Sequence, residues 1–238
     1  MARFEDCDAA VRCFDKRTGT LAWAAATGRQ IQSRPSLGRA SGRLFVGDYD
    51  GCLYAFDARG DDVGAPRWRA CAGDTIEGSS RVAYPPKARS STPAAPPRDD
   101  AAEGGAAREK GGTGREAAAA RARAAAVDEI VIVGSWDGGV WAFDGGSPNG
   151  TVLWTARIGP GGGVRTGGGV ASTPALSADH TTAFVGGPDA IWALDVRTGA
   201  TRWRYETGAM VGSSPALSAD GTALFVGCED GYLYSLAV

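Results

Sequence analysis

Four segments of the chain share one pattern of apolar and polar positions: an apolar run, a Gly, a short polar stretch with an Asp, and a second apolar run. An Asp-Gly pair between apolar runs is typical of a tight β-hairpin, because both turn positions favour positive φ. The second runs have apolar residues on both faces, as strands between stacked sheets do. The segments are "RLFVGDYDGCLYAFD" (43–57), "EIVIVGSWDGGVWAFD" (129–144), "TTAFVGGPDAIWALD" (181–195) and "ALFVGCEDGYLYSLA" (223–237).

Two further kinds of segment recur with these hairpins. One contains a Trp, as in "TLAWAAATG" (20–28), "PRWRACAG" (66–73), "TVLWTARIG" (151–159) and "TRWRYETG" (201–208). The other is rich in small residues, as in "QSRPSLG", "GSSRVAY", "ASTPALS" and "SSPALS". Each repeat therefore predicts four antiparallel strands, and the period is about 40–50 residues, which is typical of a β-propeller blade. The large Trp side chains are expected to fill the space between neighbouring blades.

The turn before each Trp strand carries a recognisable motif, Ala-x-Asp-x-x-Thr-Gly-x-x-x-Trp. Residues Ala193, Asp195, Thr198, Gly199 and Trp203 match it fully, and the stretch from Cys13 to Trp23 matches it with Cys for Ala. The motif resembles the tryptophan-docking repeat of pyrroloquinoline-quinone (PQQ)-like β-propellers. That resemblance implies an all-β fold of PQQ-like blades. The family includes quinoprotein dehydrogenases, an outer-membrane assembly lipoprotein and propeller domains of adenylate-forming enzymes, so the motif does not choose a function.

The domain organisation follows from where the repeats stop. Residues 85–127 consist mainly of Pro, Gly, Ala and charged residues, so we expect a disordered insertion between propeller blades at 1–84 and 128–238. It is either a tolerated insertion or a docking segment. The chain carries about four and a half blades, whereas PQQ-like propellers usually have seven or eight. We therefore expect an open arc: part of a larger protein, an incomplete gene model, or one partner of an assembled ring.

Composition narrows the possible functions. There are 25 Lys and Arg against 27 Asp and Glu, so no basic surface for nucleic acid is indicated. No apolar stretch approaches the roughly 20 residues of a membrane helix. The start of the chain lacks the apolar run of a secretory signal, and the five Cys are scattered without a CxxC. These features predict reduced thiols and a cytoplasmic location.

The candidate chemistry is sparse. The single His, His180, is expected to be a turn residue, and one His cannot build a triad or a His-based metal site. The turn Asp residues occupy repeat positions, where bonds to the local backbone explain them. Quinoprotein dehydrogenases use adjacent cysteines, which this chain lacks. We predict no catalytic, cofactor-binding or metal-binding residues. PQQ and calcium are expected cofactors only under the alternative that the propeller belongs to a larger enzyme. The question of enzyme activity is left open.

The hairpin turns are the better candidates for function, because the repeats differ there. Trp136 stands where another repeat has Tyr49, and we expect Trp136 to be exposed and Trp141 to lie in the core. The Gly-rich segment 159–169 is expected to be a flexible connection. We predict a scaffold that binds an unidentified protein through the face that carries the hairpin turns. The alternatives are the propeller of a larger enzyme and an envelope assembly factor. The predicted contact residues are Tyr49, Asp50, Trp136, Asp137, Asp189, Glu229 and Asp230.

Overall fold

The computed structural model of the chain describes residues 9–58, 64–87, 124, 126–159 and 169–238, and these form 17 strands. The strands are β1 (Ala10–Phe14), β2 (Leu21–Ala26), β3 (Ser36–Leu37), β4 (Arg43–Gly47), β5 (Cys52–Asp57), β6 (Pro66–Cys71), β7 (Arg81–Ala83), β8 (Ile130–Gly134), β9 (Gly139–Asp144), β10 (Val152–Arg157), β11 (Ala175–Leu176), β12 (Thr182–Gly186), β13 (Ala190–Asp195), β14 (Thr201–Glu206), β15 (Ala216–Leu217), β16 (Ala223–Gly227) and β17 (Leu233–Ala237). The predicted Gly-rich connection lies almost wholly outside these residues.

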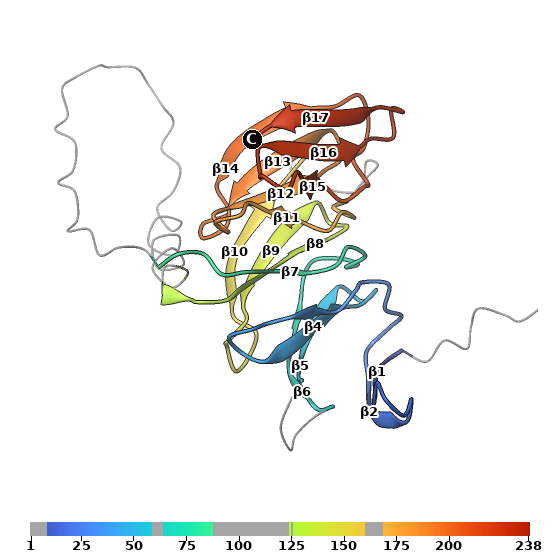
Figure 1. Cartoon of the computed structure of the whole chain (residues 1–238). Coiled ribbons are helices and arrows are strands. Elements are labelled where there is room, and N and C mark those ends of the chain that lie inside the picture. Colours follow the sequence, from blue (N-terminus) through green and yellow to red (C-terminus); the bar gives the residue numbers. More distant parts are fainter. Residues whose placement is uncertain (1–8, 59–63, 88–123, 125, 160–168) are drawn as a thin grey trace, which may run out of the picture.

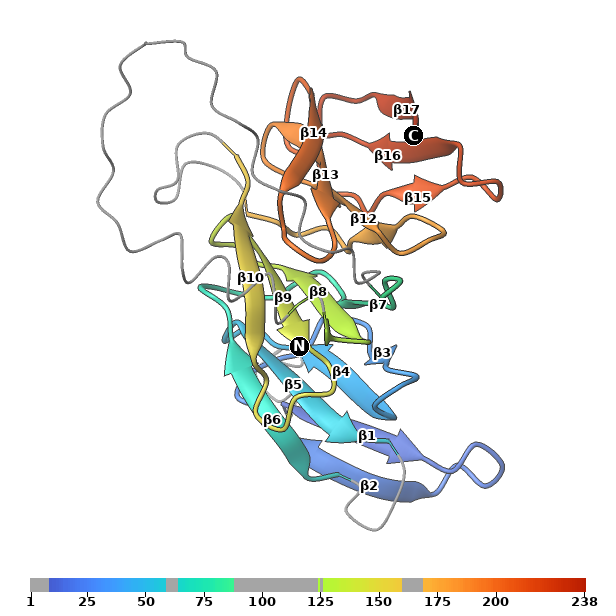
Figure 2. The ribbon, with the colours of Figure 1, turned by 90° about the vertical axis from the view of Figure 1, so that its left-hand side faces the viewer.

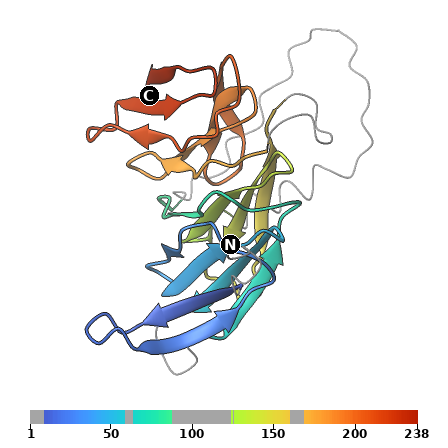
Figure 3. The ribbon, with the colours of Figure 1, turned by 90° about the vertical axis from the view of Figure 1, so that its right-hand side faces the viewer.

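The strands form five antiparallel sheets that follow one another along the chain. Three sheets have four strands each, in the orders β3-β4-β5-β6, β7-β8-β9-β10 and β11-β12-β13-β14. The pair β1-β2 and the sheet β15-β16-β17 lie at opposite ends of the stack (Figures 1 and 2). Figure 3 shows the same succession from the other side, with the two end sheets apart. The all-β fold of propeller-type blades is confirmed, and their arrangement is an open arc.

An apolar layer fills the space between each pair of neighbouring sheets. Strands β5 and β13 are buried along five of their six residues, so both of their faces meet neighbours, as the apolar pattern predicted. The layer between the second and third sheets, for example, contains Phe45, Leu53, Val131 and Phe143, each with no exposed surface. Such layers hold the arc together, because a single sheet could not bury both faces alone.

The Trp of each outer strand reaches the following sheet. The ring of Trp23 stacks on Phe56, and that of Trp68 on Phe143, with centroids 6.1 and 6.2 Å apart. Trp68 is 5% exposed. Trp203 is partly buried: it packs on the apolar layer next to the three-stranded end sheet. These contacts are the ones expected of Trp side chains between blades.

The turn before each outer strand receives the Trp of the preceding sheet. The Trp154 indole donates a hydrogen bond of 2.9 Å to the Val196 carbonyl, at the start of the next turn. A side chain at Gly64, Gly150 or Gly199 would strike the Trp of the sheet before it. All three glycines have positive φ, which L residues rarely adopt. Two constraints, the turn conformation and the Trp ring, therefore require Gly at these positions.

The Asp of the motif shapes the same turn. Asp195 Oδ1 accepts hydrogen bonds from the amides of Arg197 and Thr198 and from the Thr198 hydroxyl, at 2.9–3.0 Å. Burial raises the pKa of Asp195, but hydrogen bonds from Arg202 and Thr198 outweigh it, so the net pKa is lowered. The predicted role of this Asp in the local turn is confirmed.

The insertion leaves the fold after β7 and returns before β8, between the inner strand and the next strand of one sheet, as predicted. Most of it, residues 88–123 and 125, lies outside the described part, so its predicted disorder stays a prediction. Its two ends are held by one side chain: the Arg197 guanidinium donates to the carbonyls of Pro85 and Pro86 on one side and of Ala124 and Val127 on the other.

Two of the cysteines correct the sequence-based expectation of reduced thiols. Cys52 and Cys71 face each other across β5 and β6 and form a disulfide. The sequence separation of 19 residues hides this, because only the strand register brings the two side chains together. Cys13 and Cys228 are free thiols. Within the described ranges, no helix is long and apolar enough to cross a membrane.

Candidate interaction surfaces

The hairpin turns 48–51, 135–138, 187–189 and 228–231 are named the turn-bearing face here. Neighbouring turns are linked by hydrogen bonds through the segment that lies between them. The amide of Trp136 donates to the Thr75 carbonyl at 3.0 Å, and the Thr75 hydroxyl donates to the Tyr49 carbonyl at 3.1 Å. The Glu229 amide donates to the Met210 carbonyl in the same manner. The turns are therefore fixed to the sheets beside them.

Trp136 is 40% exposed, as expected for a contact residue. Its indole N–H donates to Glu77 Oε2 at 2.8 Å, which fixes the orientation of the ring. The pKa of Tyr49 is raised, first by burial and then by the charge of Glu77, so this carboxylate acts on both aromatic residues. Sequence reasoning missed Glu77, because it lies in a different repeat segment from either aromatic.

Asp137 bonds to its own turn, as predicted, whereas Asp50 does not: in that turn the amides of Asp50 and Cys52 donate to Asp48 Oδ1 instead, at 3.1 and 3.0 Å. Asp137 Oδ1 accepts from the Gly139 amide at 2.7 Å, and Asp137 Oδ2 lies 3.4 Å from the Arg157 guanidinium. Asp50 is more open and lies 3.6 Å from Arg29. Asp48 and Asp137 therefore shape these two turns, and the Asp50 carboxylate faces Arg29.

The last two turns differ from each other. Asp230 accepts from the Gly208 amide, the Tyr232 amide and the Tyr234 hydroxyl, and the last of these bonds contributes most to lowering its pKa. Asp189 Oδ1, by contrast, is buried without a hydrogen-bond partner among the described residues. Tyr232, which the sequence reasoning did not single out, is 70% exposed. In the sequence, Tyr232 differs from its counterparts only by its size, because the same position of the other three repeats holds Cys52, Gly139 or Ala190.

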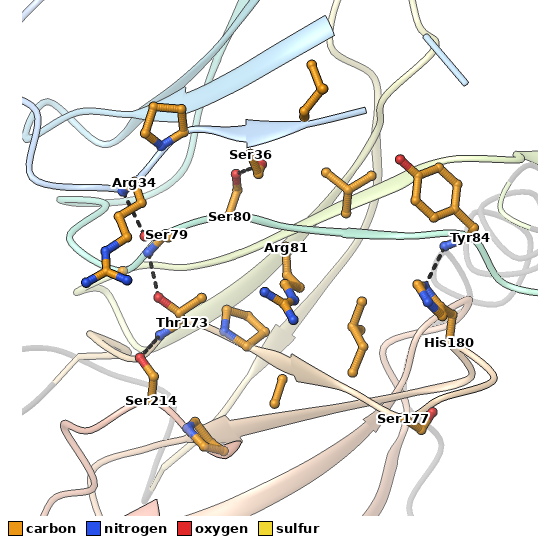
Figure 4. A pocket seen from close by; sticks show the side chains of 18 of the residues that line it. Arg34, Ser36, Ser79, Ser80, Arg81, Tyr84, Thr173, Ser177, His180 and Ser214 are labelled. Carbon is orange, nitrogen blue, oxygen red and sulfur yellow. Dashed lines mark hydrogen bonds between the residues drawn. The ribbon is translucent and has the colours of Figure 1, made fainter. Parts of the chain in front are cut away.

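A second surface lies along the inner strands β3, β7 and β11 and reaches Ser214 and Pro215, just before β15. We call it the inner groove; its volume is about 1530 Å³. Hydroxyl groups join successive sheets along it: the Arg34 amide donates to Ser79 Oγ at 2.8 Å, the Ser79 amide to Thr173 Oγ1 at 2.9 Å, and the Thr173 amide to Ser214 Oγ at 3.0 Å (Figure 4). The small residues noted in the sequence thus serve as bridges between sheets.

His180 lies at one end of the inner groove. It is a turn residue, as expected, with a positive φ of 58°. Its Nδ1 also accepts the Tyr84 amide at 3.0 Å, which links two sheets (Figure 4). The pKa of His180 is lowered, first by burial and then by the charge of Arg81, so the neutral acceptor form is favoured. This link between sheets was missed, because Tyr84 belongs to another repeat.

Across the described ranges, no group of three or more His, Cys, Asp or Glu side chains is placed to hold a metal ion. The lack of a cofactor stays a prediction, and the question of enzyme activity stays open.

Comparison with known proteins decides the family. A family model described as outer membrane protein assembly factor BamB matches residues 8–93 and 137–238, which are most of the chain. The chain belongs to this family. The unmatched stretch between the two segments contains most of the insertion. The predicted resemblance to PQQ-like propellers is confirmed.

A solved structure agrees with the family. The crystal structure of BamB from Moraxella catarrhalis matches with a TM-score of 0.61 and 18% sequence identity, over 96% of this chain and 52% of that one. At this identity the likeness shows the fold. This chain thus spans about half the length of that protein. No curated protein matches the sequence.

Proposed function

We propose that the chain is a protein-binding scaffold whose turn-bearing face contacts the partner. The observation that carries this proposal is the exposed Trp136 ring, held in one orientation by Glu77. Trp side chains often anchor interfaces, because they bury a large area and lose little conformational freedom when already fixed. The bonded backbone of the turns supplies the rigid frame that such an anchor needs.

The family supports the same role. Its description is that of an assembly factor, a type of protein that works through other proteins. We extend to this chain only the role of binding a protein partner. The repeated turns present a row of similar loops, and Trp136 is the position at which the row departs most in size from its counterparts Tyr49, Pro188 and Glu229.

We infer further that the chain works in an oxidising compartment. Structural disulfides such as Cys52–Cys71 persist mainly in such compartments. This inference competes with the cytoplasmic location expected from the sequence. Trapping thiols in intact cells with an alkylating reagent separates the two: a protected Cys52–Cys71 pair supports the oxidising compartment, and two alkylated thiols support the cytoplasm.

The test of the scaffold compares three immobilised proteins: the parent, Trp136→Ala, and Phe14→Ala. Phe14 is also an exposed aromatic but lies on the first sheet, outside the turn-bearing face. A partner should be retained by the parent and by Phe14→Ala and lost from Trp136→Ala. Hydrogen exchange of the retained complex should then show protection at turns 48–51 and 135–138. Equal retention by all three proteins would contradict the proposal.

A further inference from the structure

The inner groove contains a departure from the repeat. Arg81 begins β7, where the corresponding inner strands begin with Ser36, Ala175 and Ala216. The equivalence is fixed by strand pairing, because each of these residues pairs with the same position of the next strand. A long cation has therefore replaced a small residue on the groove side of one blade. Figure 4 shows Arg81 in the middle of the groove.

Arg81 is one of three arginines that line the groove and are exposed; the others are Arg34 and Arg39. The structure gives their guanidinium groups no hydrogen bond or ion pair with any described residue. Elsewhere the pattern is different: Arg67, for example, is paired with Asp57, and Arg202 with Asp195. Guanidinium groups bind carboxylates well, often through two parallel hydrogen bonds.

The acidic side chains of the groove are already engaged. Glu77 Oε2 accepts the Trp136 indole N–H. Asp179 Oδ1 accepts from the Ser177 hydroxyl and the Thr181 amide, at 2.6 and 3.1 Å. Three arginines face two carboxylates, and the single His is neutral, so the described lining keeps a surplus positive charge.

Apolar residues also line the groove: Leu37 is 53% exposed, and Val82 and Leu176 are partly buried against the apolar layers between the sheets. Leu37, Val82 and Leu176 are the second residues of β3, β7 and β11, and all three line the groove. A nucleic acid would favour exposed aromatic rings for stacking. Tyr84, however, packs its ring against His180, and its hydroxyl accepts the Arg39 amide. The lining suits an occupant that mixes carboxylate and aliphatic groups.

We propose that the inner groove binds an acidic, aliphatic peptide segment of a partner protein. Its carboxylates pair with the three groove arginines, and its aliphatic side chains lie on the apolar residues of the groove. This site shares Glu77 with the turn-bearing face, but the proposal does not depend on the function proposed for that face.

The test uses a fluorescein-labelled peptide of about six residues, roughly 20 Å when extended, in which Glu and Leu alternate. Fluorescence anisotropy measures its affinity for the full chain at low and high salt. Affinity should fall as salt rises, because the pairs are solvent-accessible. Arg81→Gln should weaken binding about tenfold, since it removes hydrogen bonds between charged groups. A matched control is Arg17→Gln, an exposed arginine on the β1–β2 turn, which should stay within about twofold of the parent.

Two further probes define the outcomes. A peptide of alternating Lys and Leu and a single-stranded oligouridine should both bind more weakly than the Glu–Leu peptide. The proposal is overturned if the Glu–Leu peptide does not bind, or if either of the other two probes binds as tightly as the Glu–Leu peptide. It is also overturned if Arg17→Gln loses as much affinity as Arg81→Gln. Arg39→Gln is a second groove variant, and thermal melts confirm that each variant is folded. Failure here would leave Trp136 and the turn-bearing face untouched, because those are tested by partner retention.

Discussion

Alanine at Gly199 tests the contact that joins neighbouring sheets. Gly199 and Gly19 occupy the same place in two copies of the Thr-Gly turn, with φ of 70° and 71°. A Cβ at Gly199 would lie 2.5 Å from the Trp154 ring, whereas a Cβ at Gly19 would meet nothing within 4 Å. The two substitutions therefore share the same backbone strain and differ in one steric contact.

The expected magnitudes follow from these two effects. Placing a non-Gly residue in the left-handed conformation costs about 1–2 kcal/mol. Forcing an extra methyl into a packed contact costs about a further 1–3 kcal/mol. Gly19→Ala should therefore lower the free energy of unfolding by about 1–2 kcal/mol, and Gly199→Ala by about 2–5 kcal/mol. The difference between the two is the contribution of the Trp154 contact.

Urea unfolding followed by circular dichroism measures both values, with the slopes checked for equality. A double variant, Gly199→Ala with Trp154→Ala, isolates the contact. Once the ring is truncated, alanine at Gly199 should cost no more than it does at Gly19. The reasoning is refuted if Gly199→Ala and Gly19→Ala cost the same, since Trp154 would then not press on this turn.

Three other substitutions test separate features. The pKa of His180 is lowered from 6.5 in the fold, so neutral His180 contributes its full stability above pH 6.5, and this contribution is lost as pH falls through the lowered pKa. Thermal melts should show this loss of stability in the parent. They should not show it in His180→Asn, which keeps an acceptor for the Tyr84 amide. Replacing Cys52 and Cys71 by Ser should cost about 2–4 kcal/mol in urea unfolding, and mass spectrometry after alkylation of the unfolded parent should find two more thiols with reductant than without. Arg197→Gln should speed elastase cleavage of the insertion, because the carbonyls at both of its ends lose their common donor; an unchanged cleavage rate would contradict that role.

The sequence was enough to predict the strands and their order, because the residue patterns that predict them are local. Three of the four hairpins have an Asp-Gly turn and the fourth has Asp189-Ala190, all four have their apolar runs, and each outer strand has its Trp. The disulfide could not be predicted in this way. It depends on the register of β5 against β6, and a shift of one residue would turn Cys71 to the other face of its strand.

The candidate sites also contain residues that the sequence identified and residues that only the structure revealed. Trp136 was identified because a repeat position can be compared with its counterparts in the sequence. Its partner Glu77 was not, since the bond between them joins two sheets. The same comparison would have shown Arg81 against Ser36, but the sequence does not tell that the inner strands converge on a groove. Contacts within a repeat were predictable, whereas contacts between repeats needed the three-dimensional arrangement.

In a repeat protein, a residue that recurs at every copy is explained by what each copy must do to stack. The motif Asp, the positive-φ Gly and the outer Trp all recur, and Asp195, Gly199 and Trp68 show the structural contacts that each of them makes. Selective recognition needs a feature that one copy has and the others lack. Trp136 on the turn-bearing face and Arg81 in the inner groove are two such features. The two surfaces adjoin at Glu77, which lines the groove and also holds the Trp136 ring, so the substitutions at Trp136 and Arg81 are what distinguish a partner of one surface from a partner of the other.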